Sequence, residues 1–126
     1  VEHQKSSRLI FMIYVTEFIA TYISQVILNL MKNAIDAIGT DGAIEIKCLR
    51  STDFDIVEIS DTGPGMALNI VEKIFDPFFT TKAPGKGTGL GLSISMEIIK
   101  NHRGSISVES QPGKGTTFAV KFLRVS

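Results

Sequence analysis

The sequence predicts a single α+β domain, a two-layer sandwich in which helices pack on a mixed, mostly antiparallel sheet. Three observations support this fold class. The chain has 126 residues, about the length of one average domain. Hydrophobic residues make up 44% of it, which is enough for a packed core and excludes a disordered chain. The strand patterns come in pairs joined by short turns, which favours a sandwich over a doubly wound parallel sheet.

The first part of the chain is expected to change from strand to helix. Residues 1–8 are interpreted as a linker remnant and residues 9–126 as the domain. Residues 9–15 are continuously apolar and rich in aromatic and β-branched side chains, a pattern that predicts a strand. From about residue 22 the apolar residues recur at steps of three and four, which predicts a helix, and Gly39 is expected to end it.

Two strands are expected next. Residues 43–50 and 54–60 alternate between apolar and polar side chains, and the turn-like residues 51–53 separate them. This arrangement predicts neighbouring antiparallel strands. Cys48 stands in the first alternating run, so we expect it to be buried.

The remaining elements are two helices and a closing hairpin. A short helix is expected over residues 67–74, followed by an irregular segment to about residue 87. A second long helix over 88–102 is expected to direct a set of residues toward the core, namely Leu92, Ile94, Ser95, Ile98 and Ile99. Residues 105–110 and 116–125 are expected to form a hairpin around a proline- and glycine-containing turn.

Composition excludes several classes of protein. Thirteen basic and 13 acidic residues leave no net charge, whereas a nucleic-acid binder normally carries a basic excess. The longest apolar run falls far short of the ~20 residues that cross a bilayer, and no secretory signal pattern precedes it. A single cysteine excludes a disulfide framework. We therefore expect a cytoplasmic domain that contacts neither nucleic acid nor membrane, with membrane anchoring of the parent protein left open.

The distribution of glycine carries the first functional signal. Six of the 11 glycines stand at positions 63, 65, 85, 87, 89 and 91. The run 85–91 leads into a predicted helix whose first N–H groups lack intrahelical partners, so it is suited to close contact with a polyphosphate. The alternative is a flexible loop before a helix. A P-loop is excluded because Lys86 and Lys114 are each followed by glycine, and a dinucleotide fingerprint is excluded by the late position of the run.

Two further signals come from polar residues. Asp61 ends a predicted strand directly before Gly63 and Gly65, where the alternative is an ordinary turn. The first helix carries a polar stripe at three- and four-residue spacing, made up of Gln25, Asn29, Lys32, Asn33 and Asp36. A solvated helix face is the alternative for this stripe, but such faces favour Glu and Lys over two asparagines one turn apart.

These signals coincide in order with five motifs of a known family. Residues 29–34, 61–65, 75–82, 87–92 and 115–118 are similar to its N, G1, F, G2 and G3 boxes. The chain resembles the catalytic ATP-binding domain of sensor histidine kinases, and the segment 78–82 resembles the nitrogen-regulator and sporulation-kinase branch. The resemblance implies the GHKL (Bergerat) sandwich shared with gyrase and heat-shock chaperone ATPases, in which ATP lies between helices and a mobile lid.

The resemblance also implies roles for individual residues. Asn33 matches the Mg²⁺ ligand, Asn29 and Lys32 flank the phosphates, and Asp61 accepts a hydrogen bond from the adenine amino group, supported by Thr116 rather than Thr117. The base is expected to meet residues of the G1 motif and nearby apolar walls, namely Gly63, Gly65, Met66, Ala37 and Ile70. The phosphates are expected to meet Lys82, Lys86, Gly87, Thr88, Gly89, Leu90, Gly91 and Leu92, although the two lysines are equally compatible with solvated positions.

Asn29 bears on the chemistry. Related ATPases carry a glutamate at this position as a general base. Water or a serine hydroxyl needs such a base to lose its proton when it attacks phosphorus, whereas a neutral imidazole does not. The resemblance therefore implies phosphotransfer from Mg-ATP to a histidine, with Asn29 and Lys32 as catalytic residues. Neither His3 nor His102 fits the acceptor motif, so the acceptor is expected on the helical dimerisation domain of the same kinase, with a response regulator downstream. A non-catalytic nucleotide sensor and an ATPase clamp are the alternatives.

Overall fold

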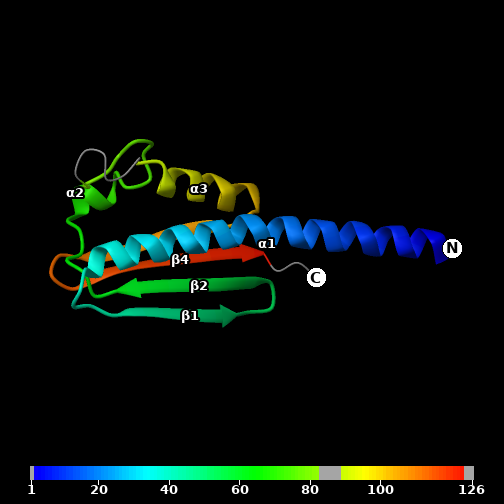
Figure 1. The fold of residues 1–126 in the computed structure, drawn as a ribbon, viewed down its shortest axis with the longest axis horizontal. Coiled ribbons are helices and arrows are strands. Elements are labelled where there is room, and N and C mark those ends of the chain that lie inside the picture. Colours follow the sequence, from blue (N-terminus) through cyan, green and yellow to red (C-terminus); the bar gives the residue numbers. More distant parts are fainter. Residues whose placement is uncertain (1, 83–88, 124–126) are drawn as a thin grey trace.

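The computed structural model describes residues 2–82 and 89–123, and within the first helix it describes side chains at Ile10 and from residue 20 onward. The elements follow one another as α1 (Glu2–Ile38), β1 (Ile44–Arg50), β2 (Phe54–Asp61), α2 (Leu68–Val71), α3 (Gly91–Asn101), β3 (Ser105–Gln111) and β4 (Gly115–Leu123). Figure 1 shows the sheet with α1 lying along it, α3 beside α1, and α2 near the end of the sheet that α1 reaches last. Across the described residues, no helix is both long and apolar enough to cross a membrane.

The sheet is antiparallel throughout, with the strand order β1-β2-β4-β3. The two hairpins expected from the sequence are present, and the pairing of β2 with β4 joins them in the centre. This pairing sets Asp61 opposite Thr116 and Ile59 opposite Phe118. Because opposite residues of an antiparallel pair project from the same face, Asp61 and Thr116 lie on the face that also carries the core residues. Thr117 lies on the other face, where its hydroxyl pairs with that of Ser60 at 2.8 Å.

One part of the fold expectation was wrong. Residues 9–15 are not a strand but part of α1, which begins at Glu2. A short apolar run is compatible with either structure, and residues 1–38 contain no glycine or proline that would stop a helix. The helical pattern that starts near residue 22 therefore continues back toward the N-terminus, and Figure 1 shows that this half of α1 projects beyond the sheet. The division into residues 1–8 and 9–126 stays a prediction.

The core lies between α1, α3 and one face of the sheet. From α1 it receives Val26, Leu30 and Ala34, which recur at four-residue steps and are at most 4% exposed. The other buried hydrophobic residues of the described chain come from β2, the segment after α2, α3, β3 and β4, and they are Ile59, Ile74, Ile99, Ile106, Phe118 and Val120. The helices thus cover only one face of the sheet, as a two-layer sandwich requires.

Two expected core positions are exposed. Cys48 is an exposed free cysteine, because β1 is the outermost strand and α1 covers its residues only slightly. Ile94 is 45% exposed, because it lies on the side of α3 turned away from Ser95 and Ile99, which are both buried. The helices are also shorter than expected, since α2 spans four residues and α3 begins at Gly91.

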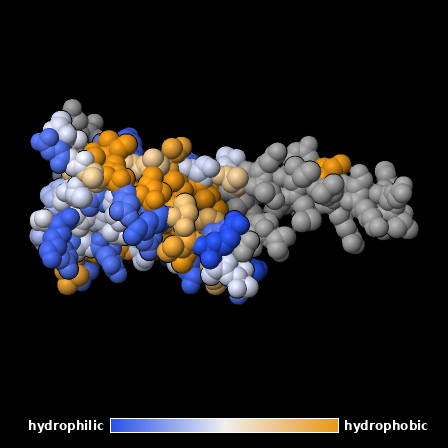
Figure 2. Space-filling view, turned by 90° about the horizontal axis from the view of Figure 1, so that it is seen from below, coloured by the Kyte–Doolittle hydropathy of each residue, from blue (hydrophilic) through white to orange (hydrophobic). Residues whose placement is uncertain are grey.

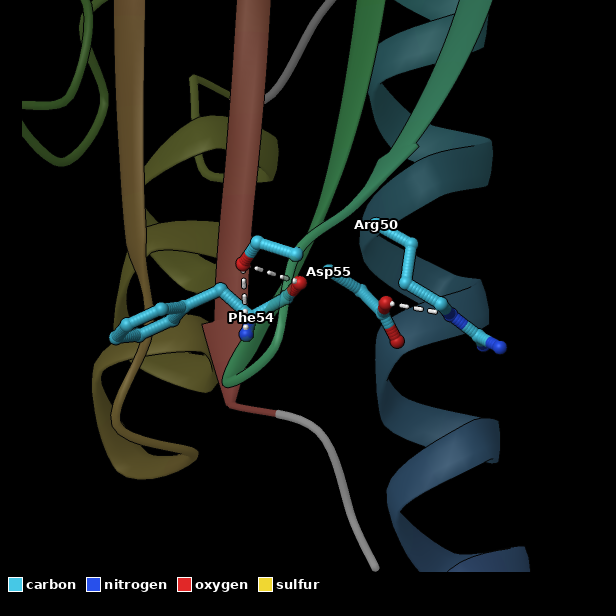
Figure 3. A network of polar contacts seen from close by, with 4 residues as sticks. Arg50, Phe54 and Asp55 are labelled. Carbon is cyan, nitrogen blue, oxygen red and sulfur yellow. Dashed lines mark hydrogen bonds and ion pairs between the residues drawn. The ribbon is translucent and has the colours of Figure 1, made fainter.

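The turn between β1 and β2 is held by short-range polar contacts, which Figure 3 shows from close by. The Ser51 hydroxyl accepts a hydrogen bond from the Phe54 N–H and lies 3.1 Å from the Phe54 carbonyl oxygen. Next to it, Arg50 Nε donates to Asp55 Oδ1 at 3.1 Å. A serine that bonds to backbone groups within a turn is the behaviour expected of the polar segment 51–53.

The helix α3 ends in a C-terminal motif that has arginine at a position where glycine is usual. The Gly104 N–H donates to the Ile99 carbonyl at 2.8 Å and the Arg103 N–H to the Lys100 carbonyl at 3.1 Å, the hydrogen-bond pattern of a Schellman motif. Arg103 occupies the position where this motif favours glycine, and its φ is +56°. The left-handed conformation places a Cβ too close to the following carbonyl oxygen, so arginine is strained there.

We expect Arg103→Gly to stabilise the protein by about 1 kcal/mol, because glycine adopts the left-handed conformation without the strain of a Cβ. Urea-induced unfolding followed by circular dichroism measures this difference. Arg103→Ala is the matched control: it removes the same charge but keeps the Cβ, so it is expected to give no comparable gain. Equal stabilities for the glycine and alanine variants would contradict the proposed strain.

Candidate nucleotide-binding cleft

A cleft of about 670 Å³ lies between α1, the ends of β2 and β4, the α2 region and the start of α3. Its volume is within the range typical of small-molecule sites. The described residues that line it come from six segments of the chain: Asn29, Lys32, Asn33, Asp36, Ala37, Asp61, Pro64, Gly65, Met66, Ile70, Ile74, Phe79, Thr80, Thr81, Lys82, Gly89, Gly91, Leu92, Thr116 and Phe118.

The α1 wall is the polar stripe of the first helix. Since Val26, Leu30 and Ala34 are buried against the sheet, the helical period turns Asn29, Lys32 and Asn33 toward α3 and into the cleft. Within the described part of the chain, no hydrogen bond or ion pair involves the side chains of Lys32 and Asn33. Their ammonium and amide groups are therefore available to a ligand.

The deep end of the cleft holds a buried carboxylate. Asp61 is 8% exposed and its neighbour Thr116 is 7% exposed. Asp61 Oδ1 accepts a hydrogen bond from the Gly63 N–H at 2.9 Å, whereas no described group donates to Oδ2. Among the described residues no fully buried side-chain oxygen or nitrogen lacks a partner, so Oδ2 must be accessible from the cleft. A carboxylate oxygen in this position is ready to accept a hydrogen bond from a ligand.

Hydrogen bonds between hydroxyl groups stabilise the deep end of the cleft beside Asp61. Thr116 Oγ1 lies 2.8 Å from Ser110 Oγ, and Ser110 Oγ accepts the Met66 N–H at 2.8 Å. These contacts connect β3, β4 and the loop that carries Met66. The loop is further tied down by the Gly113 N–H, which donates to the Pro64 carbonyl at 2.7 Å.

Two glycines of the loop after β2 are required by close packing. Gly65 has a φ of +69°, and a Cβ there would collide with the Gln111 carbonyl. A Cβ on Gly63 would lie 2.9 Å from Asp61 Oδ1 and from the Ala37 carbonyl oxygen. Gly63 does not line the cleft; its N–H holds the Asp61 carboxylate instead.

The start of α3 meets α1 across the cleft. A Cβ on Gly91 would lie 2.6 Å from Asn29 Oδ1, so glycine allows the asparagine to approach this closely. Asn29 Nδ2 donates to Ser95 Oγ at 3.0 Å, and Ser95 is only 3% exposed. This contact fixes the Asn29 amide beside the first turn of α3. Among the described residues, no side chain caps that turn, and the first N–H groups of a helix are suited to contact with an anion.

The segment 75–82, which follows α2 and carries three phenylalanines, forms another wall of the cleft through residues 79–82. The Phe78 N–H donates to the Gly89 carbonyl at 2.8 Å, and Gly89, with a φ of +73°, packs directly on the Phe78 backbone. Lys82 reaches the α1 wall, where its Nζ lies 2.7 Å from Asp36 Oδ2. Both side chains of this ion pair are more than a third exposed, so the pair contributes little stability.

The structure gathers most of the expected site residues. Of those described, only Gly63 and Leu90 do not line the cleft, and Leu90 serves as the N-cap of α3. Lys86, Gly87 and Thr88 lie outside the described residues. The sequence analysis assigned no individual role to several lining residues, which are Asp36, Pro64, Ile74, Phe79, Thr80, Thr81 and Phe118. All of them except Ile74 belong to the polar stripe or to one of the five motifs. Phe118 could have been predicted as a site residue, because strand alternation places its side chain on the same face of the strand as that of Thr116.

The described residues contain no group of three or more His, Cys, Asp or Glu side chains able to hold a metal ion by themselves. This fits Mg²⁺, which usually binds through one or two protein oxygens together with substrate phosphates and water. Asn33 offers one such oxygen at the cleft wall, next to Lys32. The donor set therefore fits a magnesium ion that arrives with a phosphate ligand.

Comparison with known proteins agrees with this geometry. Residues 19–126 match the family described as histidine kinase-, DNA gyrase B-, and HSP90-like ATPases. The C4-dicarboxylate transport sensor protein DctB of Rhizobium meliloti is 46% identical over 104 residues, which cover 81% of this chain. The signal transduction histidine-protein kinase AtoS of Escherichia coli is 48% identical over 99 residues, which cover 78% of this chain. The chain spans only 16% of the length of either relative.

Among solved structures, the nucleotide-free catalytic domain of histidine kinase ThkA is similar, with a TM-score of 0.74 and 40% sequence identity. The match covers 84% of this chain and 69% of that chain. The α+β fold expected from the sequence is thereby confirmed. The chain belongs to the family of histidine kinase-, DNA gyrase B- and HSP90-like ATPases, and it is a domain of the kind found in sensor histidine kinases.

Proposed function

We propose that this domain binds Mg-ATP and transfers the γ-phosphoryl group to a histidine on the dimerisation domain of its own kinase. The observation that carries the proposal is the polarity of the cleft. One end holds a buried carboxylate with a free oxygen, Asp61, and the other holds Lys32 and Asn33 opposite the uncapped start of α3. An adenine amino group suits the first end and a triphosphate suits the second.

The adenine end is supported by shape as well as by charge. Ala37, Met66 and Ile70 line the cleft and supply apolar surface for a planar base. Gly65 keeps the loop close to the β3–β4 turn, so no side chain from that position enters the space for the base. In this arrangement Asp61 Oδ2 accepts from the exocyclic amino group while Gly63 holds Oδ1.

The phosphate end supplies positive charge and the N-terminus of a helix. Lys32 and Lys82 extend into the cleft as ammonium donors, and the first turn of α3 adds its dipole. Asn33 would hold Mg²⁺ through its amide oxygen. The bound ion would neutralise phosphate charge, which favours attack on the γ-phosphorus. Lys82 would exchange its exposed contact with Asp36 for a phosphate oxygen.

Asn29 indicates which nucleophile the site serves. Its amide is fixed by Ser95 beside the start of α3, and an amide is not a general base. A neutral imidazole already carries a lone pair, so it attacks phosphorus without losing a proton first. Water and serine need a general base, and Asn29 does not supply one. The ATPase clamp, which would have to hydrolyse ATP, is therefore the less favoured alternative. A non-catalytic nucleotide sensor would show the same cleft without phosphotransfer.

The acceptor is expected on another domain. His102 lies at the C-terminus of α3 with Nδ1 2.7 Å from the Ile98 carbonyl oxygen, and it does not line the cleft. The partners of the proposed reaction are therefore the helical dimerisation domain of the kinase and, downstream, a response regulator. Because ATP is made inside the cell, the reaction requires this domain to lie in the cytoplasm.

The acceptor chemistry is tested by mixing the domain with the helical domain of its kinase and labelled ATP. We expect label on the helical domain that is lost in acid and retained in base, as for phosphohistidine. Replacing the acceptor histidine by glutamine is the control and is expected to abolish labelling. Label that survives acid, or release of free phosphate alone, would exclude histidine kinase activity.

Nucleotide selectivity tests the role of Asp61. We expect ATP to bind about ten- to a hundredfold more tightly than GTP, because the guanine oxygen would face the carboxylate as a second acceptor. Asp61→Asn should bring the two affinities closer together, because the Gly63 N–H keeps the amide oxygen in the place of Oδ1 and the amide nitrogen, in the place of Oδ2, can donate to the guanine oxygen. Titration calorimetry with both nucleotides measures the effect. Glu58→Gln, on the opposite face of β2, removes the same charge and should leave the ratio unchanged. Equal affinities in the unmodified protein would refute the assignment.

Magnesium dependence tests the role of Asn33. We expect Asn33→Ala to lower phosphotransfer by roughly a hundredfold and to remove the Mg²⁺ dependence of ATP binding, because the amide oxygen is lost. The unfolding midpoint should stay unchanged, since the side chain has no hydrogen bond to another described residue. Asn69→Ala on the exposed surface of α2 is the matched control. A variant with the Mg²⁺ dependence of the unmodified domain would rule out Asn33 as the ligand.

A further inference from the structure

Ser110 is a polar residue at an inward-facing position of β3. The inward positions of this strand are 106, 108 and 110, and the first two hold Ile106 and Val108, which belong to the core or pack against it. Inward positions over a core are normally apolar. The end of the molecule that carries the β3–β4 turn has a mainly hydrophilic surface (Figures 1 and 2). Ser110 is not part of that surface, because its half-buried side chain faces inward.

The Ser110 hydroxyl oxygen is the meeting point of three contacts. The Met66 N–H donates to it at 2.8 Å, Thr116 Oγ1 lies 2.8 Å away, and the Gly115 carbonyl oxygen lies 3.2 Å away. Ser110 is opposite Thr116 in the pairing of β3 with β4, and Thr116 is opposite Asp61 in the pairing of β4 with β2. These three side chains therefore form a row across the sheet. Ser110 does not line the cleft, whereas Thr116 and Asp61 do.

The number of protons determines the direction of the bond between Ser110 and Thr116. A serine hydroxyl carries one proton and two lone pairs, and the Met66 N–H already uses one lone pair. Hydroxyl-to-oxygen bonds are usually about 2.5–3.0 Å long, so the Gly115 carbonyl is distant and Thr116 Oγ1 is the better acceptor. Thr116 then keeps its own proton. Because Thr116 has no other hydroxyl partner among the described residues and lines the cleft, it can donate that proton to a ligand.

The deep end of the cleft thus presents an acceptor beside a donor. Asp61 Oδ2 accepts, and Thr116 Oγ1 donates from the facing position on the neighbouring strand. One edge of adenine carries the complementary pattern, an amino group that donates next to the ring nitrogen N1 that accepts. The same edge of guanine carries an oxygen that accepts next to an N1–H that donates. The pair of protein groups therefore matches adenine at both atoms and guanine at neither.

We propose that Ser110 is a positioning residue for the recognition of adenine. Its proton holds Thr116 as an acceptor and thereby directs the Thr116 proton toward N1 of the base. The same hydroxyl oxygen binds the Met66 N–H, so it also ties the loop that supplies an apolar wall for the base to the group that recognises its edge. The inference rests on the proposed function, and it identifies which purine atom the second polar group of the site recognises.

ATP analogues that lack one ring nitrogen test the proposal on the full chain. Carbon replaces N1 in 1-deaza-ATP and N7 in 7-deaza-ATP. We expect the unmodified chain to bind 1-deaza-ATP about tenfold more weakly than ATP, as for the loss of one hydrogen bond. Titration calorimetry with the magnesium salts measures the affinities. The analogue 7-deaza-ATP is the control, because N7 lies on a different edge of the base.

We expect Ser110→Ala to reduce the tenfold preference for ATP over 1-deaza-ATP to about twofold, because the Thr116 hydroxyl is then free to rotate away from the base. Loss of the Met66 contact alone would weaken all three nucleotides alike and leave their ratios unchanged. Ser110→Thr keeps the hydroxyl and should keep the tenfold preference. Ser107→Ala, on the exposed face of the same strand, is the matched control and should behave as the unmodified chain. Circular dichroism checks that each variant folds.

The outcomes that overturn the inference differ from those that overturn the proposed function. Equal affinities of the unmodified chain for ATP and 1-deaza-ATP would overturn the inference without any variant. So would a folded Ser110→Ala variant that keeps the tenfold preference, or a folded Ser110→Thr variant that loses it. An unmodified chain that binds none of the three nucleotides would remove the proposed function, and this inference with it.

Discussion

The burial of one face of α1 against the sheet is the constraint on which the rest of the structure depends. Val26, Leu30 and Ala34 fill the core at four-residue steps. A helix that buries these residues has no freedom to rotate, so its remaining faces are assigned at the same time. One flank turns Asn29, Lys32 and Asn33 into the cleft. Leu28 and Ile35, which are 65% and 54% exposed, lie on the side of the helix turned away from the sheet. The hydrophobic contact thus positions polar residues that contribute nothing to the core.

The opposite wall of the cleft is fixed by strand register and by close backbone packing. Pairing of β2 with β4 sets Asp61 against Thr116 on the helix-covered face. Glycine at positions 63 and 65 lets the loop after β2 approach Ala37 and the β3–β4 turn, and Gly91 lets α3 approach Asn29. At each of these positions a Cβ would meet backbone or side-chain atoms at less than van der Waals distance. Glycine therefore serves here to bring backbones together as well as to leave room for a ligand.

The two edge strands of the sheet, β3 and β1, differ in the side chains that they expose. At β3, polar side chains alternate with residues packed on the core, and α3 lies close by. At β1, apolar and oppositely charged residues alternate on an open edge.

The sequence by itself determined the local elements and the order of the motifs. Strand alternation predicted both hairpins, the three- and four-residue period predicted the second half of α1, and the positions of Asn29, Asn33, Asp61 and the glycines indicated a phosphate and purine site. It did not determine the state of residues 9–15, because an apolar run of that length suits a strand or a helix equally. Only the tertiary structure decided that Cys48 and Ile94 are exposed and that Asn29 is held by Ser95. Burial and long-range contacts depend on which elements meet in space, and a local pattern carries no information on a partner 66 residues away.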